Sequence, residues 1–422
     1  MSSVHAISPE GEIMRTRLAW FSGLAVVGIL TLGGTNRALA QQGGGQVVKL
    51  GEGETLTISG FINGTLYSNN GFFTFGQGQN AEWANAAQPA TDKNYLEGDV
   101  RNTRINFTFQ GSPVLGKWSP RGVLEADFFG AFAYAPPATT GAPPFADEQP
   151  QLRIRFAYAD LTNGRTTIRL GQFWSPLFGE VPVSVTHVAF PLGYGATGMI
   201  GWRFPGLYLY HDLNPGKPTV MQLVLGAFEG SGPEVNAGTG IGSGEASGMP
   251  QLEARLNFTH RKPNLSWSAY VVGHVSWQDT TAVGVAGDNL QGSGVEVGGN
   301  VTANKLTIHG NAYTGKAMGQ QFAHITQQGN VKGSGAWVQG GYDFTPHWGA
   351  WVYYGLDDPK EGADSPGLTG NYRSKNEDVS GMLRFRAGRY QVGLEYFHAN
   401  TTWATSGQQK ATQVALSAMY TI

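Results

Sequence analysis

The feature that most constrains this chain is a two-residue alternation of apolar and polar side chains that recurs along most of its length. The stretch Gln151–Gly179 shows it most clearly. Every second residue at its start is apolar, namely Leu152, Ile154, Phe156 and Tyr158. Arg153 and Arg155 alternate with them and are expected on the other face of a β-strand. No segment is helical over a length that could cover so many apolar faces. Lipid is therefore their expected environment, around a water-filled lumen.

The first forty residues have the pattern of a secretory signal peptide. Arginines at 15 and 17 precede an apolar run over residues 18–32, and alanines at 38 and 40 fit a cleavage site. Met14 is the expected natural start. The alternative is a single membrane-spanning helix, but the run is short and Gly and Thr interrupt it. We expect a signal peptide over residues 1–40, a short periplasmic segment over 41–54 and a barrel over 55–422.

Composition supports an all-β chain and excludes several kinds of site. Glycine is abundant at 62 residues, aromatic residues make up 12% and charged residues only 14%. This combination suits many strands joined by turns, with aromatic residues at the membrane interfaces. Because cysteine is absent, thiolate metal sites, disulfides and cysteine nucleophiles are excluded. The formal net charge of −2 gives no reason to expect a nucleic-acid partner. We expect no metal and no cofactor.

The alternation and the turn residues predict sixteen membrane-crossing strands. They span residues 55–67, 101–110, 121–130, 151–161, 165–173, 199–212, 218–228, 251–260, 265–277, 292–302, 305–313, 335–344, 349–356, 379–386, 390–399 and 411–422. Fourteen or eighteen strands are the alternatives. Short turns and long loops follow one another in turn, which is typical of an outer-membrane barrel with both termini in the periplasm. We expect Pro205 and Gly206 to form a β-bulge, because proline cannot donate to a ladder.

Four segments carry a resemblance to a known family. They read TRINFTFQG from Thr103, GVLEADFFG from Gly122, LRIRFAYADL from Leu152 and GQFWSPLFG from Gly171. The chain resembles the gram-negative outer-membrane porin superfamily, and is nearest the trimeric dicarboxylate-uptake porins. This resemblance implies a homotrimeric, sixteen-stranded channel in the bacterial outer membrane, with an inward-folded third extracellular loop. Lipid and lipopolysaccharide would then surround the barrel.

Parity along the strands places charged residues on the inner wall. With apolar residues facing outward, five arginines fall on neighbouring strands of one wall: Arg104, Arg153, Arg155, Arg169 and Arg203. Glu125 and Asp127 lie on the strand between them, and Glu180 lies in the long loop after residue 173. Guanidinium groups around a confined aqueous path attract anions and can bind carboxylates, and an acid facing them sets up a transverse field. The alternative is that the acids neutralise the arginines in cross-strand pairs, and that Glu180 is a solvated loop charge.

These observations favour transport over catalysis. The chain has no G-x-S-x-G, no H-E-x-x-H and no dinucleotide-binding fingerprint, so we do not expect an enzyme. We expect a porin that lets small hydrophilic solutes diffuse passively and prefers anions such as dicarboxylates. One alternative is a channel selective for a single anion, such as phosphate or an aromatic acid. The other is a non-conducting barrel that serves as a surface receptor or structural anchor.

Overall fold

The computed structural model describes residues 45–74, 78–90, 92–130, 150–235, 238–280 and 289–422. The expected signal peptide lies outside these residues. Nearly all the described strands belong to one antiparallel sheet. Its strands are β1 (Gln46–Gly51), β2 (Glu54–Asn70), β5 (Asn94–Asp99), β6 (Arg104–Gln110), β7 (Ser119–Asp127), β8 (Arg153–Asn163), β9 (Thr166–Trp174), β10 (Arg203–Asp212), β11 (Thr219–Phe228), β12 (Gln251–Lys262), β13 (Leu265–Asp279), β14 (Asn289–Ala303), β15 (Leu306–Lys316), β16 (Lys332–Tyr342), β17 (Trp348–Pro359), β18 (Arg373–Ala387), β19 (Tyr390–Trp403) and β20 (Gly407–Thr421).

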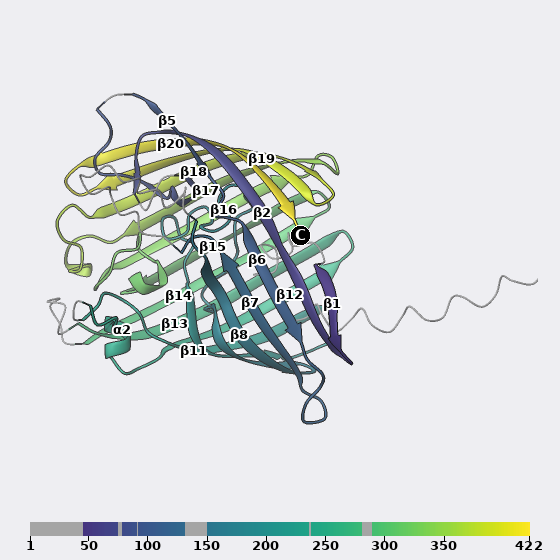
Figure 1. Ribbon diagram of the computed structural model, residues 1–422. Coiled ribbons are helices and arrows are strands. Elements are labelled where there is room, and N and C mark those ends of the chain that lie inside the picture. Colours follow the sequence, from purple (N-terminus) through teal and green to yellow (C-terminus); the bar gives the residue numbers. More distant parts are fainter. Residues whose placement is uncertain (1–44, 75–77, 91, 131–149, 236–237, 281–288) are drawn as a thin grey trace, which may run out of the picture. The chain divides into compact units, whose positions relative to one another are not determined.

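The sheet closes into a sixteen-stranded barrel. From β6 to β20 each strand pairs antiparallel with the next strand in sequence, and β20 pairs back to β2 (Figure 1). The first half of β2 pairs with β6 and the second half with β5, so β5 and β6 act as one interrupted strand. The predicted number of strands is therefore confirmed, and fourteen and eighteen are excluded.

A few elements lie outside this count. Strand β1 pairs with the start of β2, and the backbone N–H of Ile422 donates to Gly60 O, so β1 continues the line of β20. The segment expected before the barrel thus contains a strand. Strands β3 (Phe73–Thr74) and β4 (Trp83–Ala84) form a small second sheet, and α2 (Ser243–Ala246) is a single helical turn. In the described part of the chain, no helix is long and apolar enough to cross a membrane.

Burial alternates along the strands as the sequence predicts. In β16, Trp337 is 3% exposed and its neighbour Val338 is 48% exposed. Tyr342 and Tyr420, expected at the membrane interface, are about half exposed and so face outward. An apolar outer surface of this kind is what lipid requires, since chains with no water around them must satisfy every backbone group internally.

A β-bulge in β8 changes which residues face the lumen. Glu125 pairs with Phe156 and the next residue pairs with Ile154, so Arg155 is an extra residue. Arg155 and Phe156 are consequently both buried inside, and Tyr158 also faces inward. The prediction that Phe156 and Tyr158 face outward is wrong. The predicted bulge at Pro205 and Gly206 is absent, because the β9–β10 register runs unbroken there.

The loop between β9 and β10, residues 175–202 and here called the third loop, folds into the barrel. Three buried apolar clusters each join a residue of this loop to residues of the barrel strands or of other loops. Leu177 packs with Tyr270 and Val272, and Val185 packs with Phe61 and Trp351. In the third cluster, Ala196 packs with Trp83 and Trp403. The inner wall is therefore partly apolar where the loop lies against it.

Candidate functional site

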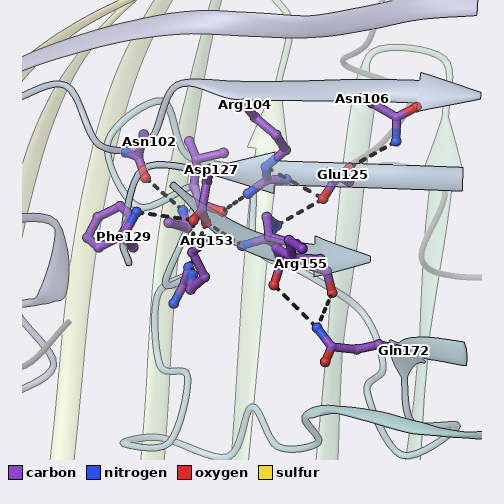
Figure 2. Close-up of polar contacts among 12 residues, drawn as sticks. Asn102, Arg104, Asn106, Glu125, Asp127, Phe129, Arg153, Arg155 and Gln172 are labelled. Atoms are coloured by element: carbon purple, nitrogen blue, oxygen red, sulfur yellow. Dashed lines mark hydrogen bonds and ion pairs between the residues drawn. The ribbon is translucent and has the colours of Figure 1, made fainter. Parts of the chain in front are cut away.

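Asp127 is the centre of a network of arginines on the inner wall (Figure 2). Arg153 binds it with two parallel hydrogen bonds, Nε to Oδ1 at 2.9 Å and Nη2 to Oδ2 at 2.6 Å. Arg155 Nη1 donates to Oδ2 at 3.0 Å, and the backbone N–H of Phe129 donates to Oδ1. The carboxylate is fully buried. Bidentate charged contacts of this kind fix both side chains in place.

Glu125, two residues earlier on β7, extends the network. Its Oε1 accepts a hydrogen bond from Arg155 Nε at 2.9 Å and lies 3.8 Å from Arg104 Nε. Asn106 donates to the other oxygen (Figure 2). Arg104 also donates to the carbonyl of Val188, at 3.2 Å. Since Val188 belongs to the third loop, Arg104 ties this loop to the wall.

Arg203 lies beside the network without a carboxylate of its own. Its guanidinium stands over the rings of Trp174 and Trp202, with centroid distances of 4.9 and 4.3 Å. Arg155 stands 5.7 Å from the same Trp174 ring, which puts the two arginines around one indole. In the part of the chain that the structure describes, Arg203 makes no ion pair, and its Nε and Nη1 have no hydrogen-bond partner.

We call this group the arginine wall. It comprises Arg104, Arg153, Arg155, Arg203, Glu125 and Asp127, contributed by β6, β7, β8 and β10. Four guanidinium groups face two carboxylates, so the group carries an excess of two positive charges. Cross-strand pairs neutralise part of the positive charge, and a net positive charge remains.

Arg169, predicted as a fifth member, belongs to another cluster. Its Nε and Nη2 donate to the two oxygens of Asp160, at 2.8 and 3.0 Å, and Arg121 binds the same carboxylate. The rings of Tyr158 and Phe173 enclose its guanidinium at 3.8 and 4.0 Å. Asp160 and Arg169 sit near the Asn163–Gly164 turn, whereas Arg153 lies at the opposite end of β8.

Glu180 lies across the lumen from the arginine wall. Ser268 Oγ and Asn300 Nδ2 donate to its carboxylate at 3.2 and 3.4 Å, and His309 Nδ1 stands 3.7 Å away. These partners belong to β13, β14 and β15, about halfway round the barrel from β7. The carboxylate is 1% exposed. Side chains of β13, β14 and β15 therefore hold Glu180 in place, and it is not the solvated loop charge that was the alternative from the sequence.

The bulge lies within the arginine wall. Arg155 is its extra residue, and Gln172 of β9 donates to the Arg155 carbonyl at 2.9 Å (Figure 2). Gly171 stands opposite, with φ of +131°. A β-carbon there would lie 2.2 Å from the carbonyl oxygen of Ala157. Only glycine allows β9 to approach the bulged strand this closely.

Carboxylates of the strands hold the third loop in place. Glu395 of β19 accepts hydrogen bonds from Ser184 Oγ at 2.6 Å and from the backbone N–H groups of Val185 and Thr186 at 2.6 and 2.8 Å. On another strand, Glu253 accepts from the backbone N–H of Leu177 at 2.7 Å. Backbone groups that a strand would have satisfied are thus satisfied by inward-facing acids.

Burial shifts the pKa values of several ionisable groups on the loops, among them His187 and Glu82. Burial lowers the pKa of His187, in the third loop, to about 4, so the ring is neutral at physiological pH. Burial, with a contribution from Asp378, raises the pKa of Glu82 well above its usual range. Neither group lies in a metal site, since the described residues contain no group of three or more His, Cys, Asp or Glu that could hold an ion.

Sequence reasoning missed two features of the site. Asp160 was not assigned to the lumen, although it pairs with both Arg121 and Arg169. Parts of two other loops also enter the barrel. Gln413 donates to the carbonyl of Gly78, and the backbone N–H of Gly201 donates to the carbonyl of Gln321. No local pattern marks these loop contacts.

Neither a known family model nor a curated protein sequence matches the chain. Solved structures do. The outer membrane channel DcaP of Acinetobacter baumannii is 21% identical, with a TM-score of 0.66 over 89% of this chain and 99% of that one. An anion-selective porin from Comamonas acidovorans is 10% identical, with a TM-score of 0.55 over 87% and 100%. OprB of Pseudomonas putida is 11% identical, with a TM-score of 0.55 over 92% and 96%. The chain has the fold of these outer-membrane porins.

Proposed function

We propose that this protein is an outer-membrane porin through which small hydrophilic solutes diffuse, with a preference for anions. The observation that carries the proposal is the charge of the arginine wall. Four guanidinium groups face two carboxylates, and Arg203 has no acidic partner among the described residues. A net positive wall in a confined path concentrates anions and repels cations.

The position of Arg203, the arginine without an acidic partner among the described residues, supports a class of solute. Arg203 stands over two indole rings, and its buried Nε and Nη1 have no hydrogen-bond partner among the described residues. We infer that these N–H groups are the ones that bind a solute carboxylate. Glu180 on the far side provides the opposite charge. We propose small mono- and dicarboxylates as solutes, in a channel formed by a homotrimer whose chains are exported by the signal peptide over residues 1–40.

The deciding experiment is single-channel recording in a planar bilayer under a tenfold KCl gradient. Stable current steps with a reversal potential on the chloride side support an anion-preferring porin. A reversal potential on the potassium side contradicts the anion preference, but it still supports a channel function. Competition by succinate or phthalate for the chloride current then tests the solute class.

A second candidate is a barrel closed to ions that acts as a receptor or anchor. Packing inside the barrel favours it, because segments of three loops meet there. Ala196 of the third loop packs with Trp83 and Ile325, which belong to two other loops. Insertion into the bilayer without any current at several voltages would support this candidate against the porin.

A further inference from the structure

The connection between β15 and β16, residues 317–331 and here called the β15–β16 loop, folds into the barrel beside the third loop. Its residues from 317 to 325 are buried or half-buried. Met318 and Ala323 belong to the same buried cluster as Leu177 of the third loop, and Ile325 belongs to the same cluster as Ala196. The two loops therefore pack against each other at two separate places.

This loop lies next to Arg203 of the arginine wall. The backbone N–H of Gly201 donates to Gln321 O at 2.8 Å, and the backbone N–H of Trp202 donates to Gln321 Oε1 at 3.2 Å. The Phe322 ring also contacts the Trp202 indole, with 4.8 Å between the ring centroids. Because Trp202 is one of the two indoles on which the Arg203 guanidinium stands, the β15–β16 loop covers part of the solute site.

The backbone of this loop is strained. His324, Ile325 and Thr326 have φ of +57°, +55° and +58°, so three consecutive residues form a left-handed turn, and Phe322 just before it has φ of +60°. Residues other than glycine adopt this conformation singly and rarely, and β-branched residues such as Ile325 and Thr326 are the least suited to it. Each such residue disfavours the conformation by about fivefold or more.

Arg373, the first residue of β18, holds the left-handed turn in place. Its Nη2 donates to Ile325 O at 2.5 Å and to Thr326 Oγ1 at 3.3 Å. Its backbone N–H donates to Gln327 Oε1 at 3.0 Å, and Gln327 Nε2 donates back to Arg373 O at 2.8 Å. These contacts and the apolar packing of Ile325 offset an unfavourable backbone. A segment held in this way has little net stability and is suited to two states.

We propose that the β15–β16 loop is a lid over the arginine wall, closed in this structure, and that it opens by releasing its left-handed turn from Arg373. When it opens, residues 324–326 return to ordinary backbone conformations, and the Trp202 side of Arg203 becomes open to solutes. The proposal rests on the proposed function, because the solute site is what the lid covers. Its movement, however, can be measured without any current.

The test is the labelling of a buried thiol, since the natural chain contains no cysteine. Ala323→Cys places the thiol in the lid, and the control Ala189→Cys places it in the third loop; the two alanines are 0% and 2% exposed. The full-length variants in liposomes are treated with N-ethylmaleimide and followed by intact mass spectrometry. We expect Ala323→Cys to react at least about tenfold faster, because the lid opens locally. Equal rates overturn the proposal.

A second set of variants, made in the Ala323→Cys protein, tests whether the left-handed turn opposes closure. Thr326→Gly and Thr326→Ala both lose the hydroxyl contact with Arg373, but only glycine adopts the positive φ without strain. We therefore expect the glycine variant to be labelled about fivefold more slowly than the alanine variant. At the exposed Gln328, whose φ is not positive, the order should reverse, because glycine gives the open loop more freedom. The same order at both positions overturns the proposal.

Single-channel currents separate this proposal from the proposed function. Fast labelling of Ala323→Cys in a protein that carries no current supports the lid and contradicts the porin. Current through a channel in which Ala323→Cys is protected as well as Ala189→Cys supports the porin and overturns the lid. Heat-dependent migration on gels confirms that each variant is folded.

Discussion

Replacing Arg203 by glutamine is expected to lower the anion preference of the channel about threefold. The substitution takes the excess charge of the arginine wall from two to one. At about 7 Å in a water-filled path, one charge changes the energy of an ion by about 0.6 kcal/mol, and 0.1 M salt reduces this to about 0.3 kcal/mol. The local concentration of anions falls by about 1.7-fold and that of cations rises by about 1.7-fold, so the anion-to-cation permeability ratio falls about threefold.

The assay is the reversal potential of single channels under a KCl gradient, measured for the unmodified protein, Arg203→Gln and Arg203→Lys. Lysine keeps the charge and loses only the planar guanidinium. It should therefore keep the chloride preference but weaken competition by dicarboxylates. Two results would refute the reasoning: a ratio for Arg203→Gln within about 1.5-fold of the unmodified channel, or an equal loss for glutamine and lysine.

Three further predictions concern the groups around Arg203. Asp127→Asn should raise the chloride preference by a similar factor, and it should cost several kcal/mol of stability in urea unfolding, because it leaves Arg153 without its buried partner. Glu395→Ala removes the acceptor of three hydrogen bonds from residues 184–186; we expect larger and noisier single-channel currents, and unchanged currents would show that this segment does not narrow the path. The pKa of His187 is about 4 in the folded chain and about 6.5 when unfolded, so the unfolded chain binds the proton first and stability falls as the pH drops from about 6.5 to about 4, by about 3 kcal/mol in all. His187→Gln should remove this part of the pH dependence of the unfolding midpoint, and an unchanged pH dependence would contradict it.

The sequence predicts the barrel well because the signal is repeated. Each of the sixteen expected segments contains or overlaps one barrel strand. The period of two depends only on whether a side chain faces lipid, and this holds for every strand in the membrane. The ends of the strands are predicted less well than their number. β18 begins at Arg373 and not at Val379, because its first residues extend beyond the apolar belt and lack alternation.

The inner wall is predicted less well, and the β8 bulge explains the main error. A single extra residue reverses the face of every residue after it. Parity without the bulge turns Asp160 towards lipid and leaves Arg169 without a partner, whereas the structure pairs them. A signal was available: Ala157, Ala159 and Leu161 alternate with Asp160, and an aspartate is costly on the lipid side of a barrel. These apolar residues indicate that Asp160 faces the lumen in the second half of β8.

The contacts of the third loop could not be predicted, for a different reason. They join residues far apart in the chain, such as Thr186 with Glu395, and involve backbone donors of an irregular segment. No periodicity applies to such a segment. Its composition of small and apolar residues around Glu180 is compatible with a solvated loop or a buried one, so only the closed barrel, which places Glu253 and Glu395 opposite its N–H groups, determines where it lies.

Ion pairing and anion selectivity are compatible within the arginine wall. A guanidinium that no partner holds loses side-chain entropy when it binds a solute, and a buried one without a counter-charge is costly. Glu125 and Asp127 reduce both costs for Arg153 and Arg155, which they fix against β7. Two carboxylates cannot balance four guanidinium groups, however, and the remaining charge falls near Arg203, over Trp174 and Trp202. We therefore expect the selectivity of the channel to depend on this excess charge and on its position near Arg203, and not on the number of arginines that the sequence places on the strands.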